Sequence, residues 1–401
     1  MPDSIGWHQD NPMNSGCTVF AELMKLLPRR AFDLAVKRYP TPRKFRRFSP
    51  MDQLLCLVFA QITGRTSLRE TVTCLGALGA RRYHSGIRTA PVKTTFAQAN
   101  ETRDYRIFMD TAMSMIAAAR IDLPVDTDLR RLQIHAFAID STTIDLCLKL
   151  FPWASFRRRK AGIKAHTMFD LRVGIPVFLW VTHAKTHDLW LLDQIAFAPG
   201  AFYVMDKGYV DYARLHRIHC AGAFFITRAK KNIHCGVREH LPVDAGSGVI
   251  NDRFIRLRGP KSRGLYPDTL RLIRYIDPQT GKRLRFLTNN LTLAAGSIAL
   301  LYRKRWRIEL FFKWIKQHLH IKAFFGTTPN AVKTQLWVAV MVYVLVHRLK
   351  DSHALTQSPN EILQILGVTL FEKTPVKQVF AELKNQKNEI EDRKQLRLFE
   401  F

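Results

Sequence analysis

Three acidic residues lie at positions where a carboxylate needs a partner. Asp140 lies inside an apolar, β-branched stretch, Asp206 ends a second apolar stretch, and Glu309 lies in a segment dominated by lysine and arginine. A buried carboxylate is costly unless it is paired, hydrogen-bonded or bound to a metal. Convergent carboxylates can hold two divalent ions ~3.5–4 Å apart, as two-metal phosphoryl transfer requires. Mg²⁺ is the natural ion for such a site because it is hard and prefers oxygen ligands.

Each of these acids also has an ordinary explanation. Asp140 could accept a hydrogen bond near Ser141, and Asp206 could cap the helix that follows it. Glu309 could be a plain helical ion-pair partner of Arg305, four residues earlier, or of Lys313, four residues later. Taken singly, these explanations are favoured. Taken together, in a strongly basic chain, the three acids favour a metal site.

The segment around Glu309 gives that acid basic neighbours at helical spacing. At about 100° per residue, Tyr302, Arg305, Glu309 and Lys316 fall within roughly 60° of one another, and Lys313 joins them. The apolar residues of the segment gather on another side, which can face a core: Ile308, Phe311, Phe312, Ile315 and Leu319. The sequence therefore predicts one helix that carries a carboxylate in a strip of phosphate-binding groups.

The charge of the chain indicates a polyanionic partner. Its 401 residues include 62 Lys and Arg against 33 Asp and Glu, for a net charge of +29. Such an excess in a folded chain points to nucleic acid before membranes or acidic proteins. Six widely spaced cysteines without a C-x-x-C pair are read as reduced thiols of a cytosolic protein. The longest apolar stretch, residues 336–346, is too short to span a bilayer and predicts a buried helix.

Strand signals begin near Pro124 and predict an α/β fold. The order of predicted elements indicates a mixed sheet with flanking helices, and Asp188 is expected to cap one of them. The predicted strands are residues 132–146, 164–171, 176–184, 201–205 and 223–228. The predicted domains are a disordered lead at 1–16, an all-helical DNA-binding domain at 17–125, a catalytic domain at 126–350 with a β-rich insertion at about 229–294, and a helical C-terminal extension at 351–401. For the helical domain, a dimerisation or packing role is the alternative.

Other possible ligands are weaker. Asp145, Asp170, Asp188 and Asp211 are further candidate carboxylates. His166, His183 and His187 have no standard metal spacing, so local hydrogen bonding is the favoured interpretation.

The pattern Tyr302-x2-Arg305-x3-Glu309-x6-Lys316 resembles the signature of DDE transposases of the bacterial insertion-sequence family four. The stretch around Asp140 looks like that family's first-Asp strand, and the stretch at Asp206, Lys207, Gly208 and Tyr209 looks like its second-Asp motif, with Lys207 where arginine is common. The resemblance covers nearly the whole chain.

That resemblance implies a ribonuclease-H-like catalytic domain interrupted by a β-rich insertion. It implies that Asp140, Asp206 and Glu309 bind two Mg²⁺ or Mn²⁺ ions, while phosphate at the element end is bound by Tyr302, Arg305 and Lys316. Lys313 and Lys207 are further candidate phosphate contacts. Arginine supplies bidentate contacts and lysine a point charge.

Some relatives stack a flipped base on a tryptophan of the insertion, but this chain has no Trp between Trp190 and Trp306. Tyr266, Tyr275 and Phe286 are the candidate replacements, because stacking tolerates any aromatic face. The cleavage route, through a hairpin or otherwise, stays open.

The function expected from these features is cut-and-paste transposition: cleavage at terminal inverted repeats and transfer of the 3′-hydroxyl into target DNA. The expected working form is a homodimer on double-stranded DNA, in the bacterial cytoplasm at the nucleoid and without a membrane. The alternatives are a metal-dependent nuclease that does not join strands and an inactive, element-derived DNA-binding protein.

Overall fold

A computed structural model describes residues 17–40, 48–79, 81–88, 91–158, 160–244, 246–318 and 324–381. The chain forms two compact units: a helical unit of Met1–Met115 with His318–Phe401, and a sheet unit of Ile116–Gln317. The predicted lead at 1–16 and most of the predicted C-terminal tail lie outside the described residues.

The helical unit is built from short helices with polar caps. Ser49 and Asp52 form a capping box at the start of α3, and Pro50 occupies its first turn. Ser67 caps its helix by accepting from the Glu70 N–H, but the Glu70 carboxylate accepts from Thr66 instead of closing the box. The helices are α1 (Val19–Met24), α2 (Arg29–Arg38), α3 (Pro50–Ile62), α4 (Leu68–Ala77), α5 (Arg81–His84), α6 (Lys93–Thr102), α14 (Pro329–Ser352) and α15 (Pro359–Thr369), while α7 (Arg106–Asp122) runs from this unit into the next.

Helix α14 is the core of the helical unit. Its 24 residues pack against α3, α6 and α15, and its apolar side chains are buried there. Among the described residues it is the one helix long and apolar enough to cross a membrane. Helix α14, which lies in the last part of the predicted catalytic domain at 126–350, packs with helices far earlier in the chain: the Asn330 side chain donates to the Asn100 carbonyl at 2.9 Å.

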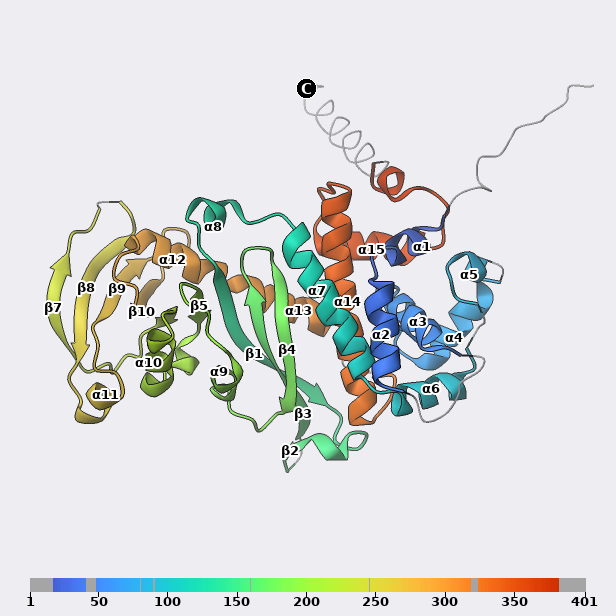
Figure 1. The fold of residues 1–401 in the computed structure, drawn as a ribbon, viewed down its shortest axis with the longest axis horizontal. Coiled ribbons are helices and arrows are strands. Elements are labelled where there is room, and N and C mark those ends of the chain that lie inside the picture. The colour runs from blue at the N-terminus through green and yellow to red at the C-terminus, as the bar shows by residue number, and fades with distance from the viewer. Residues whose placement is uncertain are drawn as a thin grey trace, which may run out of the picture. The chain divides into compact units, whose positions relative to one another are not determined.

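The sheet unit confirms the predicted mixed sheet with flanking helices (Figure 1). Its strands are β1 (Ala136–Leu146), β2 (Ser155–Arg157), β3 (Lys160–Asp170), β4 (Ile175–His183), β5 (Phe202–Met205), β6 (Phe224–Arg228), β7 (Cys235–Leu241), β8 (Val249–Leu257), β9 (Leu270–Ile276) and β10 (Arg283–Thr288). Its helices are α8 (Thr127–Arg131), α9 (Trp190–Gln194), α10 (Tyr212–Cys220), α11 (Pro260–Leu265), α12 (Ala295–Lys304) and α13 (Trp306–His318), with 3₁₀ turns η2 (Pro152–Ala154) and η3 (Lys207–Tyr209).

The strand order is β2-β3-β1-β5-β6-β10-β9-β8-β7, and β4 also pairs with β3. Strand β3 is antiparallel to β1 and β4, whereas β1, β5 and β6 are mutually parallel. The predicted β-rich region at about 229–294 contains β7 to β10 and α11. It is continuous with the rest of the sheet, because β10 pairs with β6 in antiparallel fashion.

Side-chain alternation gives the sheet two buried faces. On one face Phe137 and Tyr203 stack and pack with residues of α9 and α10, including Leu192 and Leu215. Figure 1 shows α10 in front of the sheet and α12 and α13 running behind it. Helices α12 and α13 cover the other face, where Phe311 of α13 packs on the sheet.

Candidate active site

Two adjacent parallel strands place Asp140 and Asp206 side by side. The last paired residues of β1 and β5 are Ile139 and Met205, and each aspartate follows directly. Because side chains alternate along a strand, both carboxylates leave the sheet on the face covered by α12 and α13. This shared register brings together the first two of the predicted site acids.

The neighbouring residue, Ser141, faces the opposite side of the sheet. Its Oγ donates to Asp188 Oδ1 at 2.5 Å, and Lys164 Nζ donates to the same oxygen at 3.0 Å. The prediction that Asp188 caps a helix was wrong, because α9 has Leu189 at its N-cap and no side-chain cap. Burial would raise the pKa of Asp188, but the Ser141 hydroxyl and the Lys164 ammonium outweigh it and lower the pKa.

The residues of the predicted strip lie on two helices, α12 and α13, and not on the single helix predicted. Helix α12 ends at Lys304 and α13 begins at Trp306, with Arg305 at the junction. The Ile308 N–H donates to the Arg305 carbonyl at 3.1 Å, a three-residue bond typical of a tighter 3₁₀ turn. The predicted apolar face is confirmed, since Ile308, Phe311, Phe312 and Ile315 are buried; Leu319 lies outside the described residues.

Cationic and phenolic groups hold the three acids in place. Arg305 Nη1 lies 3.3 Å from Asp140 Oδ2, and its Nη2 lies 2.6 Å from Glu309 Oε1. The Tyr302 hydroxyl donates to Asp206 Oδ1 at 3.2 Å. Arg228, which sequence reasoning missed, lies 2.7 Å from the same oxygen. Arg228 could have been found from its position at the end of a predicted strand. Strand β6 ends at Arg228 and pairs in parallel with β5, which ends directly before Asp206.

Tyr302 and Arg305 contact the acids of the site directly. Tyr302 is buried and the Arg305 side chain is only 12% exposed. Burial raises the pKa of Tyr302 to about 12, so the phenol stays protonated and can donate. Both residues support the carboxylates; their contact with phosphate stays a prediction.

The pKa values of Asp140 and Asp206 are shifted in opposite directions. Burial raises the pKa of Asp140 to about 6; Glu309 and Asp206 add repulsion, while the Ser141 N–H and Arg305 oppose the rise. Burial would also raise the pKa of Asp206, but the Lys207 backbone N–H and Arg228 together hold it below its ordinary value. The mutual repulsion shows that the three acids share one electrostatic field, which a cation among them would relieve.

The donor set fits a divalent cation in kind. All three groups offer hard oxygen ligands, the type that Mg²⁺ prefers. In the described part of the chain, no three His, Cys, Asp or Glu side chains are already close enough to form a ligand set. Arg305 and Arg228 now neutralise the acids, so binding of an ion requires these guanidinium groups to yield part of their contacts.

Several of the alternative ligands have other partners. His166 hydrogen-bonds Thr182 at 2.9 Å, as expected for local hydrogen bonding, and burial lowers its pKa to about 4. Asp170 pairs with Arg120, and Asp211 caps α10.

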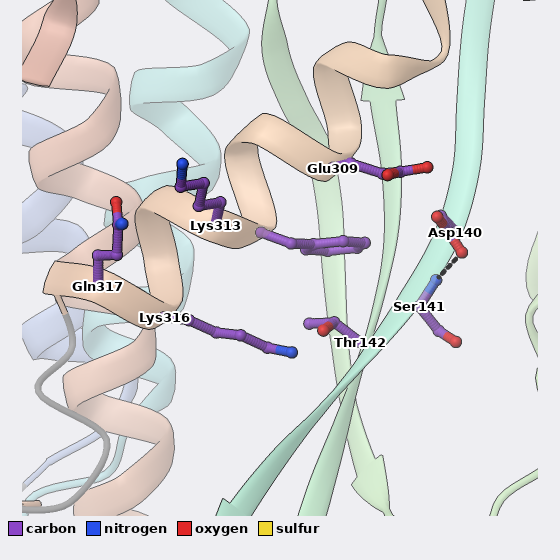
Figure 2. A pocket seen from close by; sticks show the side chains of 8 residues that line it. Asp140, Ser141, Thr142, Glu309, Lys313, Lys316 and Gln317 are labelled. Atoms are coloured by element: carbon purple, nitrogen blue, oxygen red, sulfur yellow. Dashed lines mark hydrogen bonds between the residues drawn. The ribbon is translucent and has the colours of Figure 1, made fainter.

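An open pocket of about 490 Å³ adjoins the acids. Figure 2 shows Glu309 and Asp140 pointing toward one another, and Lys316 reaching toward Thr142 of β1. Lys313 lines the same pocket but projects away from the strand. The predicted strip is thus divided: Lys316 and Lys313 are exposed, whereas Tyr302 and Arg305 are committed to the acids. Lys207 is exposed and lines a different hollow.

Two of the three candidate stacking residues cannot present a ring face. Tyr266 and Phe286 are each 1% exposed. Tyr275 is partly exposed and lines a third hollow, to which Trp306, 58% exposed, also contributes.

A buried acid fixes the helix junction that carries Arg305. Asp126 accepts from Lys304 at 2.8 Å and from Arg307 at 2.5 Å, and its other oxygen caps α8. Its side chain is 8% exposed, so the charges on both flanking residues meet a largely desolvated partner. Sequence reasoning missed this anchor, because its partners lie 178 and 181 residues away in the chain.

Comparisons with known proteins agree with this geometry. Residues 132–345 match the transposase DDE domain, and residues 15–88 match a domain of unknown function, DUF4372. The chain is 34% identical over 291 residues to a Sinorhizobium fredii protein named as the transposase y4zB, covering 72% of this chain and 80% of that one. It is 31% identical over 215 residues to a Geobacillus stearothermophilus protein named as a transposase for insertion sequence element IS5377, covering 53% and 56%.

Among solved structures, a piggyBac transposase synaptic complex with hairpin DNA matches with a TM-score of 0.42 and 11% identity, covering 92% of this chain and 83% of that one. The family match spans β1, β5 and α13, the three elements that bring Asp140, Asp206 and Glu309 together. By this domain match and its similarity to transposases of insertion sequences, the chain belongs to the DDE transposases.

Proposed function

We propose that Asp140, Asp206 and Glu309 form the catalytic centre of a cut-and-paste insertion-sequence transposase of family four, on a ribonuclease-H-like domain. The observation that carries the proposal is the paired register of β1 and β5, which sets two aspartates side by side opposite the helix of Glu309. The order β4-β3-β1-β5-β6, with only β3 antiparallel to its neighbours, supports the domain assignment.

Two Mg²⁺ ions, with Mn²⁺ as a possible substitute, are the proposed cofactors. When bound, they lower the pKa of the attacking hydroxyl and neutralise the oxygen that leaves. Asp140 and Asp206 would supply ligands from the sheet, and Glu309 would supply one from α13. Tyr302 orients Asp206 through its hydroxyl, and Arg305 separates the charges of Asp140 and Glu309.

The proposed chemistry has two successive displacements at phosphorus. In cleavage, a water oxygen bonds to the phosphorus at the element end, and the bond from phosphorus to the 3′ oxygen breaks. The products are a 3′-hydroxyl and a 5′-phosphate. In strand transfer, that 3′ oxygen attacks a target phosphorus and displaces the target's own 3′ oxygen. One phosphodiester bond forms as one breaks, so no ATP is consumed.

Lys316 and Lys313 are the proposed contacts for phosphates of the element end, since both are exposed at the acid pocket. The helical unit is proposed to read the terminal inverted repeats. Because two element ends must be cut together, we propose a homodimer on DNA, working at the nucleoid in bacterial cytoplasm.

The test is a supercoiled plasmid that carries the cognate ends, incubated with Mg²⁺. Asp140→Ala, Asp206→Ala and Glu309→Gln are each expected to abolish both cleavage and joining. The matched control is Asp145→Asn, which changes an exposed acid of the same strand and should retain activity.

The products of the plasmid assay also distinguish the transposase from the two alternative functions. Cut plasmid without joined product would identify a nuclease, and binding without cutting would identify an inactive DNA-binding protein. Parent-like cleavage by any of the three site variants would refute the proposed centre.

A further inference from the structure

A second concentration of positive charge lies on the Asp206 side of the active centre. The chain after β6 runs beside the start of β10, where the Ala229 N–H donates to the Arg285 carbonyl at 2.8 Å. Together with the turn after Asp206, these segments line an open groove of about 580 Å³. We call it the basic groove, and its six cationic residues are Lys207, Arg228, Lys230, Lys231, Arg283 and Arg285.

The basic groove has no acid in its lining. Elsewhere in the sheet unit, basic side chains that support the fold meet aspartates: Arg271 pairs with Asp252 at 2.6 Å, and Arg214 pairs with Asp193 at 2.7 Å. Within the groove, Arg228 alone has such a partner, and that partner is Asp206. A cluster of like charges without counter-charges is costly to assemble, so it indicates an anionic ligand.

Several of these cations are available to a ligand. Lys207, Lys231 and Arg283 are exposed, and their side chains form no ion pair or hydrogen bond within the part of the chain that the structure describes. Lys230 Nζ donates to the Val210 carbonyl at 3.0 Å, and Arg285 Nη1 donates to the Lys231 carbonyl at 3.3 Å, which hold the walls of the groove together.

Arg228 links the basic groove to the acids. Its guanidinium contacts Asp206 and also lines the groove, while Lys207 and Gly208 follow Asp206 directly. The acid pocket, by contrast, is lined by Asp140, Glu309 and the lysines of α13. Cationic surfaces therefore adjoin the acids in two separate places.

Resting on the proposed function, we propose that the basic groove binds the phosphate backbone of target DNA, while the lysines of α13 bind the element end. Strand transfer brings two DNA strands to one set of acids, and one cationic surface can follow only one backbone. Two surfaces that flank the same carboxylates satisfy this requirement. An open groove lined mainly by cationic side chains also suits a DNA backbone that is bound without regard to base sequence.

The test uses the full chain with Lys231→Ala and Arg283→Ala combined. The matched control combines Lys261→Ala and Arg263→Ala, which removes the same charge from exposed positions on α11. The first measurement is affinity for a duplex of unrelated sequence, without divalent metal, across a range of salt. Two lost phosphate contacts are expected to reduce the slope of log affinity against log salt by about 2, with the control unchanged. An unchanged slope in the groove variant would show that the groove holds no phosphates.

The second measurement separates target from element end. Precut element ends are joined to a target plasmid, and cleavage of uncut ends is followed in parallel. The groove variant should join less than the parent at about 50 mM salt, and this deficit should shrink by on the order of tenfold at about 200 mM, because the variant has two fewer phosphate contacts for salt to weaken. Its cleavage should match that of the control.

Equal loss of cleavage and joining would assign the groove to the element end and overturn the target assignment. A parent protein that neither cuts nor joins would overturn the proposed function and the target assignment with it. The salt measurement would still decide, in that case, whether the groove binds DNA.

Discussion

Arg305 bridges Asp140 and Glu309, with one guanidinium nitrogen 3.3 Å from the first carboxylate and another 2.6 Å from the second. The bridge joins an acid of the sheet to an acid of the helix that covers it. It also sets a positive charge where the divalent ions are proposed to bind, so the guanidinium and an ion would stabilise the same pair of acids.

Removal of this bridge should increase the response of the protein to metal. Arg305→Ala leaves Asp140 and Glu309 to repel each other, so the metal-free protein should lose about 1–3 kcal/mol of stability. Added Mg²⁺ should then raise the melting temperature more than it does in the parent, because only the ion remains to screen the acids. Thermal unfolding with and without Mg²⁺ measures both effects.

The control for Arg305→Ala is Arg303→Ala, an exposed arginine of the last turn of α12. It should leave the Mg²⁺ response unchanged. If Arg305→Ala and the parent show the same Mg²⁺-dependent shift, the ion does not bind between these acids.

The ionised Asp140 carboxylate is expected to lower the free energy of unfolding of the metal-free protein. Its pKa is raised to about 6 in the folded protein, against an ordinary 3.8, so folding favours its protonated form. As pH rises from about 4 to above 6, the unfolded chain releases this proton first, and the folded state loses stability relative to it. Two pKa units correspond to about 3 kcal/mol at most, and partial exposure reduces this to about 1–2 kcal/mol.

Asp140→Asn should therefore stabilise the metal-free protein by about 1–2 kcal/mol at pH 7.5, with the gain vanishing near pH 4. The amide keeps an oxygen for the Ser141 N–H, which donates to Asp140 at 2.8 Å. Urea unfolding in a chelator, at both pH values, gives the comparison. A variant that is less stable than the parent at pH 7.5 would contradict the raised pKa.

The sequence was sufficient for those parts of the site that depend on local pattern. Asp140 could be located because it interrupts a β-branched apolar run and Asp206 because it ends a second apolar run, while the buried face of α13 follows from helical spacing. Relations between distant segments could not be predicted. The pairing of Ile139 with Met205 and the contact of Arg228 with Asp206 depend on which distant strands lie side by side, and the pattern of one strand does not specify its partner.

Two further features of the structure also depend on contacts between segments that are distant in the chain. The break at Arg305 interrupts a segment with good helical spacing, and it depends on the anchoring of its neighbours Lys304 and Arg307 by Asp126. Helix α14 packs with α3 and α6, which precede it by more than 200 residues, and no local pattern indicates those contacts.

Asp126 offers a test of that anchoring. Asp126→Ala removes the cap of α8 and leaves Lys304 and Arg307 without their buried partner, which should cost about 3 kcal/mol. Asp128→Ala is the control, since the Asp128 side chain is 40% exposed and pairs with Lys304 at the surface, so its loss should cost under about 1 kcal/mol. Equal losses in urea unfolding would show that Asp126 is not the anchor of the junction.

Lys316 should contribute to DNA binding without contributing to the fold. It is exposed and reaches toward Thr142 at the mouth of the acid pocket (Figure 2). Lys316→Ala should reduce the slope of log affinity against log salt for element-end DNA by about 0.9, the effect of one phosphate contact. Gln317→Ala, at the next position of the same pocket, should leave the slope unchanged, and circular dichroism should report both variants as folded. Since Lys313 projects away from β1, Lys313→Ala should weaken cleavage less than Lys316→Ala; the reverse order would place the element end on the other side of α13.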